Sequence, residues 1–255
     1  MPDAFYRFPL PLIKGKFIRR TNRFLAEVEI RRRKELAHIP HTGRLPELLV
    51  PGRTCWLAPA KNPKRRKTSW TLTLVENERT VLGCIDTSVP NKLVKMMAET
   101  HGIYGLEKWQ YANHEINFGD SRIDLVLRNA SRKMLVEVKS VTWVVDGVAL
   151  FPDAPTDRGR KHLHTLMRAI ARGFEASIVF VVQRNDAKCM RIASFIDPKY
   201  LETARIAKQV GIRFLAFKCE VSPREVKIDS RLPLELKPPP RTVIKSVLQF
   251  HSLRN

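Results

Sequence analysis

Apolar and polar positions follow two different patterns along this chain, and the change falls near residue 81. Before it, short segments that alternate or run β-branched are separated by Pro, Gly and Asn, which is typical of strands joined by turns. The predicted strands there are Phe24 to Ile30, Arg53 to Pro59 and Ser69 to Glu76. Residues 1–80 are therefore predicted to form a small β-barrel or sandwich.

After residue 81, helical and strand patterns alternate. Pro90-Asn91 opens an amphipathic helix over Lys92 to His101, which stops at Gly102. The other predicted elements are strands at Ser121 to Arg128, Lys133 to Val144, Ala176 to Gln183 and Ile212 to Val221, and helices at Gly159 to Arg172 and Asp197 to Val210. This order predicts an α/β domain over residues 81–235. Residues 236–255 form a basic, Pro-rich tail, in which Val243 to Phe250 could make a short helix.

The amino-acid balance is strongly basic. The 255 residues include 46 Lys and Arg against 25 Asp and Glu, a formal net charge of +21. Such a field attracts polyanions and gains free energy when counterions leave phosphates, so nucleic acid is the expected partner. The alternative is that the basic surface only keeps the protein soluble. We find no amphipathic helix of the kind that binds an anionic membrane.

The chain shows no signal-peptide pattern. Its longest apolar run, around Ile178 to Val182, is far shorter than the roughly 18 residues that a membrane span needs. The four cysteines form no CxxC pair, so we expect reduced, mostly buried thiols and no zinc site. These observations predict a cytoplasmic protein.

Two carboxylates stand where the strand pattern calls for apolar side chains. Asp124 and Glu137 each have aliphatic neighbours in predicted strands that a short polar turn connects. Side chains alternate along a strand, so Glu137 and Lys139 share a face, and a tight hairpin would bring Asp124 beside them. Because one lysine cannot neutralise two buried carboxylates, a divalent cation is expected there.

Mg²⁺, or Mn²⁺, prefers oxygen ligands and keeps several waters, so Asp124 and Glu137 are the predicted metal ligands. Together with Lys139 they are the predicted catalytic residues of phosphodiester hydrolysis, in which Lys139 would orient the attacking water or stabilise the transition state. The pattern resembles the PD-(D/E)xK nuclease core. An acid followed by Glu-x-Lys also arises by chance, and an ordinary salt bridge between edge-strand charges is the alternative.

The chain also resembles the sugar fermentation stimulation protein A family along nearly its whole length up to about Leu236. The matching segments are Arg23-Phe-Leu-Ala-Glu-Val-Glu, His38-Ile-Pro-His-Thr-Gly43, Asn62-Pro-Lys-Arg65, Pro90-Asn-Lys-Leu-Val94, Ser121-Arg-Ile-Asp124, Val136-Glu-Val-Lys139, Phe151-Pro-Asp-Ala154, Arg158-Gly-Arg-Lys-His-Leu163, Phe180-Val-Val-Gln-Arg184 and Ile196-Asp-Pro198. The resemblance implies an N-terminal OB-like barrel, a C-terminal nuclease-like domain, DNA binding and a proposed nuclease activity. Its site residues map onto Asp124, Glu137 and Lys139.

The chain departs from the family pattern in two places. Ile39, His41 and Arg44-Leu45 stand in a motif that is usually closer to His-Cys-Pro-Asn-Thr-Gly-Ser-Met, and Pro155 follows Phe-Pro-Asp-Ala. These changes leave the paired acids untouched.

Basic residues in two loops are predicted to contact phosphates. The first set lies in a turn between predicted barrel strands, flanked by Trp56 and Trp70, which we assign to the core: Lys61, Lys64, Arg65, Arg66 and Lys67. The second set, Arg158 and Lys161, opens a predicted helix. Capping of that helix by Thr156 or Asp157, with the basic residues simply exposed, is the alternative.

Three further side chains are candidates for accessory roles. Asp153 could add a metal ligand, His162 could be a general acid, and Gln183 could position the attacking water. For each, a purely structural role is the alternative.

Taken together, the sequence predicts an α/β fold with an all-β N-terminal domain: an OB-like barrel followed by a PD-(D/E)xK nuclease-like mixed-sheet domain. The expected function is binding of nucleic acid, DNA rather than RNA, with Mg²⁺-dependent or Mn²⁺-dependent hydrolysis. The rival is a non-catalytic DNA-binding regulator that retains a nuclease-like scaffold. A homodimer is a further expectation, since many nuclease-like folds pair to cut two strands.

Overall fold

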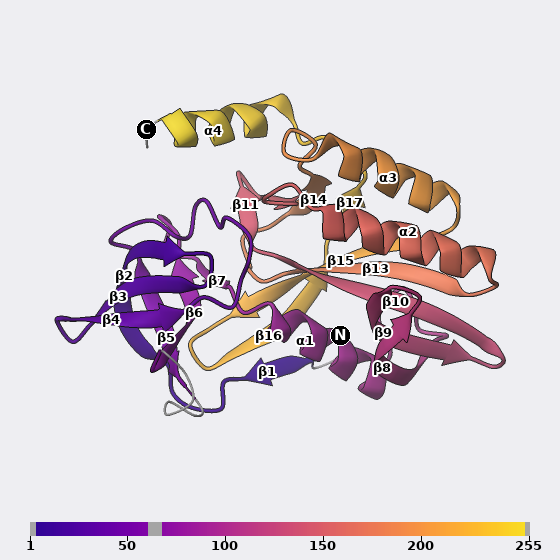
Figure 1. The fold of residues 1–255 in the computed structure, drawn as a ribbon, viewed down its shortest axis with the longest axis horizontal. Helices are drawn as coiled ribbons and strands as arrows, with labels where there is room; N and C mark the ends of the chain where they lie inside the picture. Colours follow the sequence, from indigo (N-terminus) through magenta and orange to yellow (C-terminus); the bar gives the residue numbers. More distant parts are fainter. Residues whose placement is uncertain (1–3, 61–67, 253–255) are drawn as a thin grey trace.

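The computed structural model describes residues 4–60 and 68–252, and its N-terminal part is a closed barrel (Figure 1). The barrel strands are β2 (Ile13–Asn22), β3 (Leu25–Ile30), β4 (Arg33–His38), β5 (Thr54–Pro59) and β6 (Trp70–Glu76), with β7 (Leu82–Cys84) added beside β6. Pairing of β4 with β6 closes the barrel. Because side chains alternate along a strand, β3 buries Ala26, Val28 and Ile30 and turns its two glutamates outward.

The second domain is built on a seven-stranded mixed sheet in the order β1-β16-β15-β13-β10-β9-β8. Its strands are β1 (Phe5–Arg7), β8 (Gln110–Phe118), β9 (Ser121–Asn129), β10 (Arg132–Val141), β13 (Glu175–Val182), β15 (Arg213–Val221) and β16 (Glu225–Arg231). The central strands β10, β13 and β15 run parallel, and β13 is buried from Ala176 onward, as expected of a strand covered on both faces. Strand β1 precedes the barrel in sequence yet pairs with β16.

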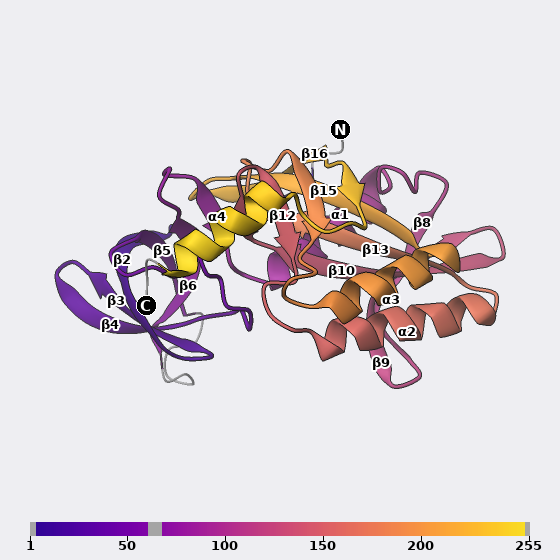
Figure 2. The same ribbon diagram turned by 90° about the horizontal axis from the view of Figure 1, so that it is seen from above.

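Helices cover both faces of this sheet (Figures 1 and 2). Helix α1 (Ser88–Thr100) packs on one face, and α2 (Asp157–Ala171) and α3 (Pro198–Gln209) pack on the other. Consecutive residues of β10 serve the two cores: Val136 packs with α1, and Leu135 packs with α2. The sheet is therefore the middle layer of three, and both cores are apolar.

A smaller four-stranded sheet and a C-terminal helix complete the domain. The sheet contains β11 (Trp143–Val145), β12 (Val148–Phe151), β14 (Cys189–Ile192) and β17 (Leu234–Glu235). Helix α4 (Arg241–Ser252) packs Val243 and Val247 against Trp143 and Leu150. Figure 2 shows α4 extending from this sheet over the barrel.

Polar contacts join the barrel to the second domain. Arg184 is fully buried and pairs with Glu47 from the barrel side and with Asp186, whose Oδ2 lies 2.5 Å from Nη2. The Asp153 carboxylate accepts a hydrogen bond from the Leu45 backbone N–H at 3.1 Å. We call these contacts, made by Glu47, Asp153, Arg184 and Asp186, the domain seam.

The predicted fold class is confirmed: an OB barrel is followed by a mixed-sheet domain. Helices α2 and α3 begin and end within two residues of their predicted bounds. The predicted strand over Lys133 to Val144 is divided between β10 and β11, because the chain leaves the large sheet after Val141 and enters the small one. Strand β8 was not predicted, since most of its side chains are exposed and polar. Among the described residues, no helix combines the length and apolar character required to cross a bilayer.

Candidate active site

Asp124 lies where strands β9 and β10 part. Their ladder ends at the pair Leu125 and Val136, and the Asp124 side chain then takes the place of a backbone partner. Its Oδ2 accepts a hydrogen bond from the Val138 N–H at 2.7 Å, and its Oδ1 accepts one from Asn91 Nδ2, also at 2.7 Å. Asn91 belongs to the first turn of α1. The aspartate is thus oriented by backbone and side chain together.

Glu137 lies on β10, directly after Val136 of the last ladder pair, and is only 3% exposed. Its Oε1 accepts a hydrogen bond from Lys139 Nζ at 2.7 Å and contacts Nδ1 of His162, which α2 supplies. The Lys139 and His162 nitrogens lie 3.3 Å apart. The structure therefore brings together Glu137, Lys139 and His162, and it places Lys139 on the same face as Glu137, as strand alternation predicts.

The two carboxyl groups have opposite pKa shifts. Burial, together with the negative charge of Glu137, raises the pKa of Asp124 to about 7. Burial acts in the same direction on Glu137, but Lys139 and His162 outweigh it, and the pKa of Glu137 lies below its ordinary value. At neutral pH, Asp124 is therefore divided between its protonated and ionised forms, whereas its neighbours favour the ionised form of Glu137.

The site has more anionic oxygen than its neighbours satisfy. Glu137 Oε2 is buried and has no hydrogen-bond partner among the described residues, a costly arrangement for a carboxylate oxygen. A divalent cation would relieve both this oxygen and the raised pKa of Asp124. The described part of the chain holds no group of three or more His, Cys, Asp or Glu side chains suited to a metal. Two carboxylates, with carbonyls and waters as the other ligands, still match the coordination that Mg²⁺ prefers.

The two basic candidates on α2 lie in different places. The Arg158 Nε is 3.5 Å from His162 Nε2, so Arg158 reaches the edge of the site. Lys161 instead contacts Asp120, with Nζ 3.1 Å from the carboxylate and 3.0 Å from the backbone carbonyl. Thr156 caps the helix by accepting a hydrogen bond from the Gly159 N–H at 3.0 Å.

Asp153 and Gln183 are not in contact with the paired acids. Asp153 belongs to the domain seam. The Gln183 side-chain nitrogen donates to the Asp86 carbonyl at 3.2 Å and to Ser140 Oγ at 3.0 Å. These two side chains link structural elements around the site. Lys61, Lys64, Arg65, Arg66 and Lys67 lie outside the described residues.

Two residues near the acids were missed from the sequence. Asn91 was predicted to open a helix and lies in the family-like segment Pro90-Asn-Lys-Leu-Val94, but neither pattern gave its amide a role beside the acids. Tyr200 of α3 is fully buried; burial raises its pKa, and the charges of Glu137 and Asp197 raise it further. Its hydroxyl has no hydrogen-bond partner in the described part of the protein. No sequence pattern distinguishes Tyr200 from an ordinary core tyrosine.

The fold and site define a class of two-domain proteins in which an OB barrel precedes a mixed-sheet domain with paired acids at a strand junction. The profile of the SfsA N-terminal OB domain matches residues 18–84, and that of the sugar fermentation stimulation protein RE domain matches residues 88–225. This chain belongs to the sugar fermentation stimulation protein family.

Individual relatives agree with this assignment. A sugar fermentation stimulation protein homolog of Syntrophotalea carbinolica is 42% identical over 235 residues, which cover 90% of this chain and 99% of that protein. A sugar fermentation stimulation protein homolog of Desulforamulus reducens is 35% identical to this chain over 225 residues, which cover 88% of this chain and 93% of that protein. The solved structure of Pyrococcus furiosus SfsA in complex with Ca²⁺ is similar, with a TM-score of 0.83 and 28% identity, and covers 92% of this chain and 100% of that one.

Proposed function

We propose that this protein binds DNA and hydrolyses its phosphodiester bonds with the help of a divalent cation held by Asp124 and Glu137. The observation that carries the proposal is the buried acid pair, in which Asp124 has a pKa raised to about 7 and Glu137 keeps one oxygen without a partner. Structural acids are normally neutralised by their surroundings, whereas functional ones are often left under-compensated. Asp124 and Glu137 are under-compensated, as functional acids often are.

Each side chain has a role that its contacts support. A bound cation would supply charge stabilisation at the phosphoryl oxygens and a more acidic water. Asn91 and the Val138 N–H fix the orientation of Asp124. Lys139 holds Glu137 ionised, and its ammonium group would stabilise negative charge on a phosphate oxygen bound at the site. His162, bonded to the same Glu137 oxygen, could move a proton to or from the reacting groups.

Exposed basic residues on the barrel support binding of a polyanion. Arg31, Arg32 and Arg33 lie exposed at the turn between β3 and β4, and the net charge of the chain is +21. Phe24 is 48% exposed at the preceding turn, with the Arg23 guanidinium over its ring. An exposed aromatic beside cations is what stacking on single-stranded bases requires.

The Ca²⁺ in the Pyrococcus furiosus structure supports a divalent cation in this family. Carboxylate oxygens bind both Ca²⁺ and Mg²⁺, and the two ions differ mainly in ligand number and in how many waters they retain. For this chain we propose Mg²⁺ or Mn²⁺ as the working ion, because the described residues bring only two carboxylates, Asp124 and Glu137, together at the site.

The test is cleavage of labelled single-stranded and double-stranded DNA and RNA, with Mg²⁺, Mn²⁺ or EDTA. We expect metal-dependent cleavage of DNA by the native chain and a loss of about 100-fold or more in Asp124→Ala and Glu137→Ala. Asp120→Asn and Glu99→Gln, which change exposed carboxylates, are the matched controls and should cleave normally.

Two results would contradict the proposal. Cleavage that survives both alanine substitutions would place the activity elsewhere or in a contaminant. Tight, salt-sensitive binding of DNA without cleavage under any metal condition would instead support a DNA-binding regulator that retains the scaffold.

A further inference from the structure

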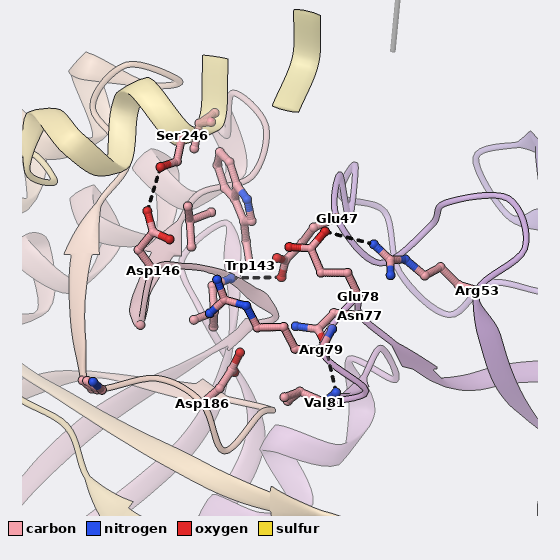
Figure 3. A pocket seen from close by; sticks show the side chains of 15 residues that line it. Glu47, Arg53, Asn77, Glu78, Arg79, Val81, Trp143, Asp146, Asp186 and Ser246 are labelled. Atoms are coloured by element: carbon pink, nitrogen blue, oxygen red, sulfur yellow. Dashed lines mark hydrogen bonds and ion pairs between the residues drawn. The ribbon is translucent and has the colours of Figure 1, made fainter. Parts of the chain in front are cut away.

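A cavity lies where the barrel, the second domain and α4 meet (Figure 3). Its volume is about 360 Å³, within the range of pockets that hold small molecules. Asn77 and Arg79 from the turn between β6 and β7 form one wall, the β11–β12 hairpin with Trp143 forms the second, and Ser246 of α4 lies on the third. Small-molecule sites occur preferentially at such domain junctions.

The acids that line this cavity have partners within the protein. Glu47 and Asp186 both pair with the buried Arg184. Glu78 lies 3.5 Å from the Arg53 guanidinium, and Asp146 accepts a hydrogen bond from Ser246 Oγ at 2.7 Å. Each of these acids therefore has a hydrogen-bond or ion-pair partner within the protein before any ligand enters.

Two cations of the lining differ from these acids. Arg79 and Lys188 are exposed, and among the described residues neither takes part in an ion pair. Figure 3 shows Arg79 extending across the cavity toward Trp143. Lys188 lies beside the β11–β12 hairpin, since its backbone N–H donates to the Gly147 carbonyl at 2.7 Å. The cavity thus has two cationic side chains without an acidic partner among the described residues.

The remaining lining offers a neutral donor and an apolar wall. Asn77 is buried, and its Oδ1 accepts hydrogen bonds from the backbone N–H groups of Arg79 and Val81, both at 2.9 Å, which leaves the amide nitrogen as a donor. Val81, Trp143 and Val145 supply apolar surface. A ligand that fits would combine a doubly charged anion with a compact apolar or aromatic body.

We propose that this cavity binds a small organic phosphate, with the phosphate between Arg79 and Lys188 and the body against Val81 and Trp143. A phosphate monoester carries close to two negative charges at neutral pH, which matches the two free cations. The planar guanidinium can donate two parallel hydrogen bonds to phosphate oxygens. A carboxylate accepts the same pair of bonds, so it is the second negative charge of the phosphate, facing Lys188, that distinguishes the two ligands.

The site is separate from the paired acids and does not depend on the proposed hydrolysis. None of its lining residues contacts Asp124, Glu137 or Lys139. A ligand held there would touch the barrel, the second domain and α4 at once, so its binding energy would favour the arrangement of the three.

Isothermal titration calorimetry on the full chain in EDTA tests the proposal with three probes: AMP, adenosine and inorganic phosphate. We expect AMP to bind, and adenosine and phosphate each to bind at least tenfold more weakly. Adenosine lacks the phosphate that the two cations would bind, and phosphate lacks the body that would pack against Val81 and Trp143. Arg79→Gln and Lys188→Gln should each weaken AMP binding tenfold or more. Both residues are exposed, so these variants should fold normally, which thermal melting verifies.

Two further variants separate this site from the acid pair. Asp124→Asn should bind AMP as the native chain does, and Val145→Trp, which fills the cavity, should not bind it. AMP binding that persists in Arg79→Gln and Lys188→Gln, or that is lost in Asp124→Asn, would overturn the proposal, as would absence of AMP binding to the native chain. Cleavage of DNA is a separate readout, and its failure would leave this result unchanged.

Discussion

The acids of the domain seam and the acids of the candidate active site are both partly or fully buried, yet their surroundings differ. At the seam, Glu47 and Asp186 share the buried Arg184, and Asp153 accepts a backbone N–H. At the site, Asp124 and Glu137 have one lysine and one histidine between them, and one carboxylate oxygen has no partner among the described residues.

The difference separates acids that stabilise the fold from acids available for chemistry. A fully paired acid keeps its charge and its geometry, and removing its partner leaves an uncompensated charge. An under-compensated acid pair costs stability in the free protein and gains it when a cation binds. The predictions below test whether the two regions differ in this way.

The largest effect on stability is expected at the seam. Arg184→Met removes a fully buried guanidinium and leaves Glu47 and Asp186 facing each other, so the free energy of unfolding should fall by about 3 kcal/mol in urea titration. Arg213→Met, which removes an exposed ion pair with Glu175, is the matched control and should cost at most about 1 kcal/mol. Equal losses in the two variants would mean that the seam is no more than a surface contact.

The next effect is the pH dependence of the acid pair. The pKa of Asp124 is raised to about 7 in the folded chain from 3.8, so folding favours its protonated form. Its contribution to stability is complete below about pH 4 and is lost as pH rises to about 7, with roughly 2–3 kcal/mol of the loss falling between pH 5 and pH 8. Urea titrations in EDTA at pH 5 and pH 8 should show this loss in the native chain and not in Asp124→Asn.

A divalent cation should reverse that loss. At pH 8, Mg²⁺ or Mn²⁺ should raise the melting temperature of the native chain and leave that of Asp124→Asn unchanged. Asp120→Asn, with its carboxylate exposed on the same hairpin, should behave as the native chain does. A pH dependence that is identical in the native chain and Asp124→Asn would mean that Asp124 is compensated like the seam acids.

The smallest effect is expected at Asp153. Asp153→Ala removes the acceptor of the Leu45 N–H and should cost about 1–2 kcal/mol, measured by urea unfolding, while leaving metal-dependent stabilisation intact. Asp157→Asn, which alters the exposed acid at the start of α2, serves as the control. If Asp153→Ala abolished stabilisation by the cation, Asp153 would belong with the site and not with the seam.

Much of the fold could be predicted because the periodic patterns are strong where strands and helices are amphipathic or fully apolar. The segment around Ile178 to Val182 could only be a buried strand, and the glycines after α2 and α3 marked where each helix ends. Strands β2 and β8 could not be predicted, because the charged residues of β2 and the exposed polar residues of β8 resemble those of a loop. The pairing of β1 with β16 was also invisible, since a three-residue strand carries too little pattern.

Only part of the candidate site could be predicted from the sequence. Glu137 and Lys139 share a strand, so their common face follows from alternation alone, and the hairpin brings Asp124 near them. His162 and Asn91 come from helices whose rotation about their axes depends on packing, so their approach to the acids could not be derived. Asp153 follows a recognisable motif, but its contact with Leu45 depends on how two domains dock, which no local pattern encodes.

The position of β1 has a consequence for the order of events during synthesis. Phe5–Arg7 leaves the ribosome before the barrel strands but pairs with Lys227, Val226 and Glu225, which are made about two hundred residues later. The barrel strands between them are local in sequence and can close while the chain is still growing, whereas the large sheet is incomplete until β16 emerges. Strand β1 therefore joins the large sheet only after β16 has been made, and a nascent protein that stops short of β16 exposes the edge of β15.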